Sequence, residues 1–138
     1  MFKRLFFWGL TAGILSAVAS IIYHRIFGFA FTYEGLPDYS RVTNIPVLIA
    51  VNLIAGMLAA VACFVCIKLF KSKAELIFNL FFSLASFASI MYPISVTLPL
   101  EIKNPELFPL LTVPMHFFPA IAWYTVRPIF GASVFETT

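Results

Sequence analysis

His116 is the residue of this sequence with the widest choice of chemistry, because it lies in the middle of an apolar stretch. An imidazole in such surroundings can relay protons, ligate a metal or a haem, or bind a substrate. The simpler interpretation is a neutral ring that forms a hydrogen bond inside the folded protein. Its partner would be Asn52, a serine on a neighbouring helix, or a backbone carbonyl that a proline has freed. We favour this simpler interpretation, in which His116 is structural.

Two prolines, Pro114 and Pro119, lie on either side of His116. A proline inside a helix removes one backbone hydrogen bond, so Pro114 frees the carbonyl of Leu110 and Pro119 frees that of Met115. A carbonyl freed inside hydrocarbon must find another donor. The helix around His116 is therefore expected to be kinked and to offer acceptors to polar side chains nearby.

Four further polar side chains occur at positions from which they could edge one cavity with His116. If these groups converge, they indicate a small transporter, a channel or a binder of a hydrophobic molecule. If they contact separate neighbours, they are ordinary links between helices. The candidate cavity residues are His116, Asn52, Asn79, Ser86 and Tyr92.

The remaining reactive residues do not assemble into a catalytic site. Cys63 and Cys66 form a C-x-x-C pair, but membrane thiol oxidoreductases that reduce quinones also need a second pair outside the membrane. A haem held by His24 and His116 would need both ligands at one depth, whereas helical rise separates them by roughly 12 Å. No G-x-S-x-G, H-E-x-x-H or Walker sequence is present. We expect no enzyme activity, no metal and no cofactor.

The composition identifies the environment of the chain. Hydrophobic residues make up 62 % of the 138 residues and charged residues only 11 %. An ordinary soluble domain is about 45–50 % apolar and about 25 % charged. The basic residues lie at the ends of apolar stretches and form no patch, which excludes a nucleic-acid partner. The lipid bilayer is therefore the expected surroundings of an integral membrane protein.

The apolar stretches predict an all-α fold, a polytopic antiparallel bundle of four transmembrane helices in one membrane domain, residues 1–138. Each crossing needs about 20 residues, so no room remains for a second domain. Short connections make neighbouring helices antiparallel. We expect Asn44 to cap the second helix and the third to bend or break near Tyr92 and Pro93. The expected spans are 5–22, 45–70, 76–100 and 108–126, with an outside loop at 23–44.

The basic residues predict the orientation. Four spans place the N-terminus, the second connection and the C-terminus on one side of the membrane. That side carries six basic residues and the other carries three, so the positive-inside rule places both termini in the cytoplasm and the bundle in the inner membrane. The six are Lys3, Arg4, Lys68, Lys71, Lys73 and Arg127, and the three are Arg25, Arg41 and Lys103.

Pro46 begins the second predicted helix, and Thr112 precedes Met115 and His116 in the fourth. In these residues and in its layout, the chain resembles the small four-helix bacterial membrane proteins grouped as domains of unknown function. The resemblance covers the whole chain in layout. It implies a four-helix membrane fold and favours His116 as a family feature, but it implies no particular activity.

Small residues recur every four positions at Gly9, Gly13 and Ala17 in the first helix, and Gly56 lies among alanines in the second. Such faces let two helices approach closely, so these two should pack together. The Phe-rich surfaces of the third and fourth helices would then meet lipid or a protein partner. We expect a small non-enzymatic membrane protein that acts as an accessory or assembly subunit or as a self-associating homo-oligomer. The alternative is a transporter, channel or hydrophobic-ligand binder around His116.

Overall fold

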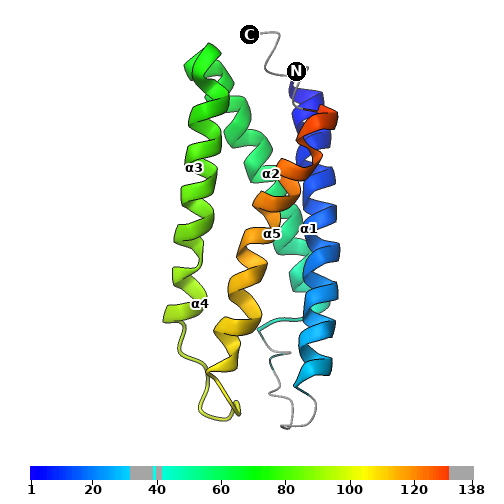
Figure 1. Cartoon of the computed structure of the whole chain (residues 1–138), viewed down its shortest axis with the longest axis vertical. Coiled ribbons are helices and arrows are strands. Elements are labelled where there is room, and N and C mark those ends of the chain that lie inside the picture. The colour runs from blue at the N-terminus through cyan, green and yellow to red at the C-terminus, as the bar shows by residue number, and fades with distance from the viewer. Residues whose placement is uncertain (32–38, 40–41, 131–138) are drawn as a thin grey trace.

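The computed structural model describes residues 1–31, 39 and 42–130. Helices make up 85 % of these residues, which contain no strand, so the all-α prediction is confirmed. The long helices lie alongside one another in an elongated body (Figure 1). The elements are α1 (Phe2–Ala30), α2 (Ile45–Phe70), the 3-10 turn η2 (Lys71–Lys73), α3 (Ala74–Ser89), α4 (Met91–Ser95) and α5 (Leu107–Phe130).

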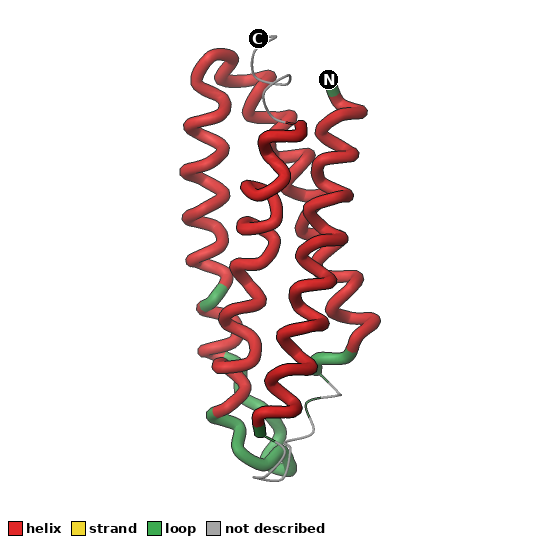
Figure 2. Tube along the Cα trace, turned by 45° about the vertical axis from the view of Figure 1, so that its right-hand side comes forward, coloured by secondary structure: helices red, strands yellow, loops and turns green. Residues whose placement is uncertain are grey.

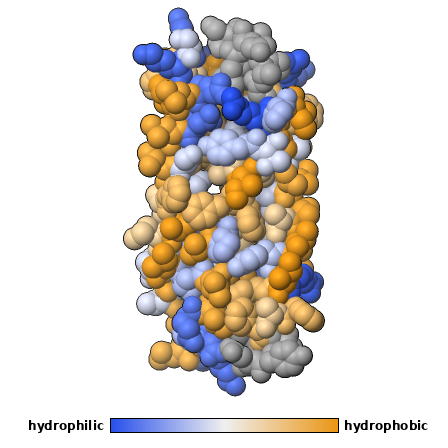
Figure 3. All heavy atoms as spheres, viewed as in Figure 1, coloured by the Kyte–Doolittle hydropathy of each residue, from blue (hydrophilic) through white to orange (hydrophobic). Residues whose placement is uncertain are grey.

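Three helical stretches among the described residues are long and apolar enough to cross a membrane: Phe2–Ala30, Ile45–Ser95 and Leu107–Phe130. The second stretch reverses direction at η2, so α2 and α3 run in opposite directions (Figure 1). Hydrophobic residues dominate the middle of the face in Figure 3, and strongly hydrophilic residues gather at its two ends. This distribution is the one that a bilayer requires.

The second helix has the predicted boundaries, but the first is longer than predicted. The Asn44 side chain accepts a hydrogen bond from the Val47 N–H at 3.0 Å, so the expected N-cap of α2 is confirmed. The end predicted at residue 22 is wrong, because α1 continues to Ala30. Tyr23 and Phe27 pack against α5, which extends the buried side of α1 by two turns. The loop predicted at 23–44 is thus helical over 23–30, and its positions 32–38 and 40–41 lie outside the described residues.

The third predicted span, 76–100, is interrupted and shorter than predicted. Helix α3 ends at Ser89 and α4 covers Met91–Ser95, with residues 96–99 non-helical. Pro93 has no N–H to donate to the Ser89 carbonyl, which explains why the helix breaks at Ile90 (Figure 2). The bend expected near Pro93 is therefore present, one turn earlier.

The last helix continues beyond its predicted end at residue 126. Helix α5 reaches Phe130 and includes Pro128. The Arg127 guanidinium forms an ion pair with the Glu75 carboxylate, which joins the end of α5 to the first turn of α3. This contact is partly exposed, so it fixes the position of the helix end more than it adds stability.

The first two helices pack through their small residues, as predicted. A Cβ atom built on Gly56 would lie 2.9 Å from the Gly13 nitrogen, and one on Gly9 would lie 2.8 Å from the Ala60 Cβ. The two backbones therefore touch, and glycine is required at the crossing. The small-residue faces of α1 and α2 are therefore buried against each other within one chain.

A cluster of aromatic residues holds α5 against α1 at the end of the body that carries the N-terminus. The Trp8 and Trp123 rings are stacked with centroids 4.3 Å apart. The Trp8 indole N–H donates to the Trp123 carbonyl at 3.0 Å. Phe78 of α3 packs against Trp123, so three helices meet here. Away from the η2 turn, α3 and α2 separate along the body (Figure 1).

Candidate functional site

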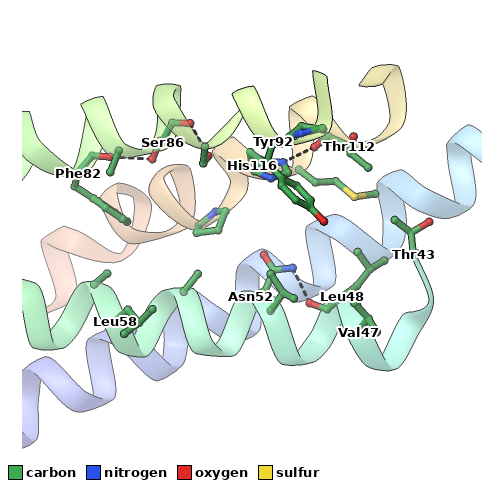
Figure 4. A pocket seen from close by; sticks show the side chains of 18 of the residues that line it. Thr43, Val47, Leu48, Asn52, Leu58, Phe82, Ser86, Tyr92, Thr112 and His116 are labelled. Carbon is green, nitrogen blue, oxygen red and sulfur yellow. Dashed lines mark hydrogen bonds between the residues drawn. The ribbon is translucent and has the colours of Figure 1, made fainter. Parts of the chain in front are cut away.

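A groove of about 660 Å³ lies between α2, the α3–α4 segment and α5 (Figure 4). Its volume falls in the range of about 300–1,000 Å³ that small-molecule sites occupy. No charged residue is among those that line it. The apolar lining residues include Val47, Leu48, Val51, Ala55, Leu58, Ala59, Ala62, Phe78, Phe81, Phe82, Ala85, Pro93, Phe108, Met115 and Pro119.

The groove is long. Its lining on α2 extends from Val47 to Ala62, which helical rise converts to about 22 Å. Most of the residues that line it are apolar, so an extended hydrocarbon chain could contact apolar side chains along this length.

Asn52 lines the groove, but its amide is used between α1 and α2. Its Nδ2 donates to the Ser20 hydroxyl at 3.1 Å and to the Leu48 carbonyl at 2.7 Å. Its Oδ1 accepts a hydrogen bond from the Ser16 hydroxyl. Ser16, Ser20 and Asn52 are all buried. Asn52 is therefore a polar link between two helices and has no hydrogen on its amide left for a ligand.

The serine and threonine hydroxyl groups along the groove are also used internally. Each donates its hydrogen to a carbonyl close by in the chain, a common arrangement for serine and threonine in helices. None of them can donate to a ligand without giving up that bond. The bonds run from Thr43 to Tyr39 (3.2 Å), from Ser86 to Phe82 (2.9 Å), from Ser89 to Ser86 (2.7 Å) and from Thr112 to Phe108 (2.8 Å).

His116 lines the groove with one ring nitrogen fixed. Its Nδ1 lies 2.8 Å from the Thr112 carbonyl oxygen, which can only accept, so Nδ1 carries the hydrogen. In the neutral ring Nε2 is then an acceptor, and it forms no hydrogen bond within the described part of the chain. The expected partners were Asn52, a serine or a freed carbonyl, and the structure shows none of these.

The carbonyl that Pro114 frees has a different partner. The Leu110 oxygen accepts a hydrogen bond from the Tyr23 hydroxyl at 2.9 Å. This contact joins the extended part of α1 to α5 and satisfies the acceptor that the proline leaves open. It belongs to the packing of the helices, because neither Tyr23 nor Leu110 lines the groove.

Tyr92 and Asn79 have opposite outcomes as candidate cavity residues. Tyr92 lines the groove from α4, and its phenol extends toward α2 in Figure 4. Its hydroxyl forms no hydrogen bond among residues 1–31, 39 and 42–130.

Asn79 does not line the groove, so its predicted placement in the cavity was wrong. It lies in the first half of α3, where its backbone carbonyl accepts a hydrogen bond from the Tyr124 hydroxyl at 3.1 Å.

The structure brings together four of the five predicted cavity residues, but most of the groove was not predicted. Its walls are valines, leucines, alanines and phenylalanines on α2 and α3. Helix α2 is hydrophobic on every side, so its sequence carries no periodic signal that separates the groove face from the exposed face.

The described residues hold no cluster of three or more potential metal ligands. Cys63 is buried in the core beside α1 and α5, and Cys66 is half-buried; both are free thiols. Neither cysteine lines the groove. The pair therefore packs as small apolar side chains.

No family model, curated protein or solved structure matches this chain.

Proposed function

We propose that the chain crosses the inner membrane four times, with both termini in the cytoplasm. Helix α3 alone has 16 residues, about 24 Å, which is short of a bilayer of about 30 Å. Together, α3 and α4 extend from Ala74 to Ser95, or about 33 Å, and this is sufficient for a crossing of their own.

The charge distribution supports this orientation. Figure 1 places the N-terminus, the α2–α3 turn and the end of α5 at the same end of the body. Lys3, Lys71 and Arg127 are among the six basic residues of that end. Of the three assigned to the opposite end, Arg25 and Lys103 are exposed there, and Arg41 lies outside the described residues. The positive-inside rule assigns the richer end to the cytoplasm.

The function that this geometry supports best is non-enzymatic binding of one hydrocarbon chain in the groove. The observation that carries the proposal is the mostly apolar lining, without a charged residue, that follows α2 for about 22 Å. The walls supply apolar contact along this length, and each methylene that leaves water for such a wall contributes about 0.8 kcal/mol. A chain that arrives from lipid gains less, because it exchanges one apolar contact for another.

A polar transport path is less well supported. The side chains of Asn52, Ser86 and Thr112 direct their hydrogens to protein acceptors, and no charged group lines the groove. An ion in such a groove would lose its water without gaining partners. Within the alternatives of transporter, channel and hydrophobic-ligand binder, these contacts favour the binder.

Photolabelling tests the groove. The probe is oleyl methyl ether with a diazirine in the middle of its chain, and the protein is reconstituted in vesicles. Replacing Ala55, a groove residue, with phenylalanine fills the passage, so labelling of α2 and α3 should fall about tenfold, equivalent to about 1.4 kcal/mol. The measurement is the yield of labelled peptides by mass spectrometry.

Ala50→Phe is the matched control, because Ala50 is an exposed residue of α2 that does not line the groove. Its labelling should equal that of the unchanged protein. Equal labelling of the Ala55→Phe and Ala50→Phe variants would contradict the proposal, since the probe would then be contacting only the lipid-facing surface.

Assembly with another membrane protein, or self-association, is the second candidate function. The observation that favours it is a row of large apolar side chains on α3, each at least 60 % exposed: Leu76, Leu80, Leu84 and Phe87. Native mass spectra of the same samples report the number of protein copies. A stable dimer or larger complex would favour assembly, and a monomer carrying one chain would favour the groove.

A further inference from the structure

Two polar groups of the groove have no protein partner in the described part of the chain: the His116 Nε2 and the Tyr92 hydroxyl. The other polar side chains that line it direct their hydrogens to protein acceptors. A ligand therefore meets one fixed acceptor and one free hydroxyl. Both belong to the half of the groove near the α4–α5 connection (Figure 4).

We infer that the groove binds a single-chain amphiphile with an uncharged hydroxyl head, which His116 and Tyr92 hold together. This inference rests on the proposed function, because it names the class of molecule that occupies the groove. The hydroxyl of the ligand donates to Nε2 of His116, whose hydrogen on Nδ1 is already given to Thr112. The oxygen of the same hydroxyl accepts from the Tyr92 phenol. One hydroxyl is both donor and acceptor, so it matches both groups.

Charged heads do not fit this pair. No lysine, arginine, aspartate or glutamate lines the groove, so a phosphate or carboxylate would have no opposite charge within it. His116 follows the start of α5 by nine residues, which places it about 13 Å along the helix and inside the hydrocarbon layer. An ion at that depth needs a partner of opposite charge, whereas a hydroxyl needs only its two hydrogen bonds.

The groove also orients the ligand. From Ala55 to Ala62 on α2 and from Phe78 to Ala85 on α3, its lining is apolar. The head therefore lies toward the α4–α5 connection, on the outer side in the proposed topology, and the tail extends toward the η2 end. A molecule inserted in the opposite sense would place its hydroxyl among phenylalanines without a partner.

Competition between two ligands that differ in one hydrogen tests the inference. Oleyl alcohol can donate and accept, whereas oleyl methyl ether can only accept. Each is titrated against the photoprobe in vesicles. The unchanged protein should prefer the alcohol by about fivefold, the effect of one hydrogen bond.

His116→Leu and Tyr92→Phe should act differently. His116→Leu removes the acceptor, so alcohol and ether should bind equally, while the ether binds as it does to the unchanged protein. Tyr92→Phe removes the donor that both ligands use, so both should weaken by about fivefold and the preference for the alcohol should remain. His24→Leu, the same change at a histidine outside the groove, should leave both affinities unchanged.

A preference for the alcohol that persists in His116→Leu would overturn the inference, and so would equal binding of both ligands to the unchanged protein. In either case the ether would still compete, and the proposed hydrocarbon-chain groove would stand. If neither ligand displaces the probe from the groove residues, the proposed function itself fails. Unaltered binding of the ether to His116→Leu also shows that this variant is folded.

Discussion

Replacing Gly56 with alanine is expected to destabilise the fold by about 3 kcal/mol, because the new methyl group would enter the backbone of α1. The built Cβ meets the Gly9 carbonyl oxygen and lies 3.0 Å from the Gly13 Cα. Backbone atoms cannot rotate away as a side-chain end can, so α1 and α2 must separate. Resistance to unfolding by sodium dodecyl sulfate, followed by tryptophan fluorescence in mixed micelles, measures the loss.

The matched control is Gly28→Ala in α1, because nothing lies within 4 Å of the Cβ built there. Alanine is the better helix former by about 1 kcal/mol, so this variant should be as stable as the unchanged protein or slightly more stable. Gly56→Ala should destabilise the protein and Gly28→Ala should not. Comparing the two variants therefore excludes a general effect of introducing alanine on stability. A Gly56→Ala variant as stable as Gly28→Ala would contradict the close crossing of α1 and α2.

Asn52→Leu should destabilise the protein by about 2 kcal/mol. The change removes an amide that bonds Ser16, Ser20 and the Leu48 carbonyl, and it leaves two buried hydroxyls without their partner. Contacts between polar side chains of membrane helices contribute about 0.6 kcal/mol each on average and up to about 1.7. The same unfolding measurement in sodium dodecyl sulfate reports the difference.

A triple variant distinguishes the effect of the lost hydrogen bonds from the effect of the changed side-chain shape at Asn52. Adding Ser16→Ala and Ser20→Ala to Asn52→Leu removes both sides of the polar link, and replacing both partners by apolar groups is close to neutral. The triple variant should therefore recover most of the stability. Asn79→Leu, a change of the same type on α3 outside the groove, should have a smaller effect. A triple variant less stable than Asn52→Leu alone would show that the polar link is not the reason for the loss.

The sequence was sufficient to predict elements whose ends carry their own local signals. Asn44 and Pro46 define the start of α2, and the lysines of the next turn define its end. The end of α1 had a misleading signal, because Tyr23, His24 and Arg25 form a polar run that nevertheless continues the helix. The Tyr23 ring and, one turn later, the Phe27 ring pack on α5, and this tertiary contact cannot be read from local composition.

The candidate site was predictable in its polar residues and not in its shape. An apolar helix with isolated polar positions draws attention to Asn52 and His116, whose burial must be compensated. The groove lies between α2, the α3–α4 segment and α5, so it depends on how segments far apart in the sequence pack together. Tyr92 lines it from α4, beyond the break at Ile90. This arrangement is a consequence of packing between helices, so no single segment contains it.

The proposed crossing by α3 and α4 determines how the groove lies in the membrane, because these two helices form one of its walls. Exposed residues bracket this segment, Ser72 in η2 before it and Lys103 in the connection after it. Cysteines at these two positions, in a background with Cys63→Ala and Cys66→Ala, can be labelled in intact cells with a maleimide that does not cross membranes.

Four crossings predict that Lys103→Cys reacts from outside, while Ser72→Cys reacts only after the membrane is opened. Reaction of both cysteines from the same side would mean that α3 and α4 do not cross, and it would contradict both the four-crossing bundle and the position of the groove within it.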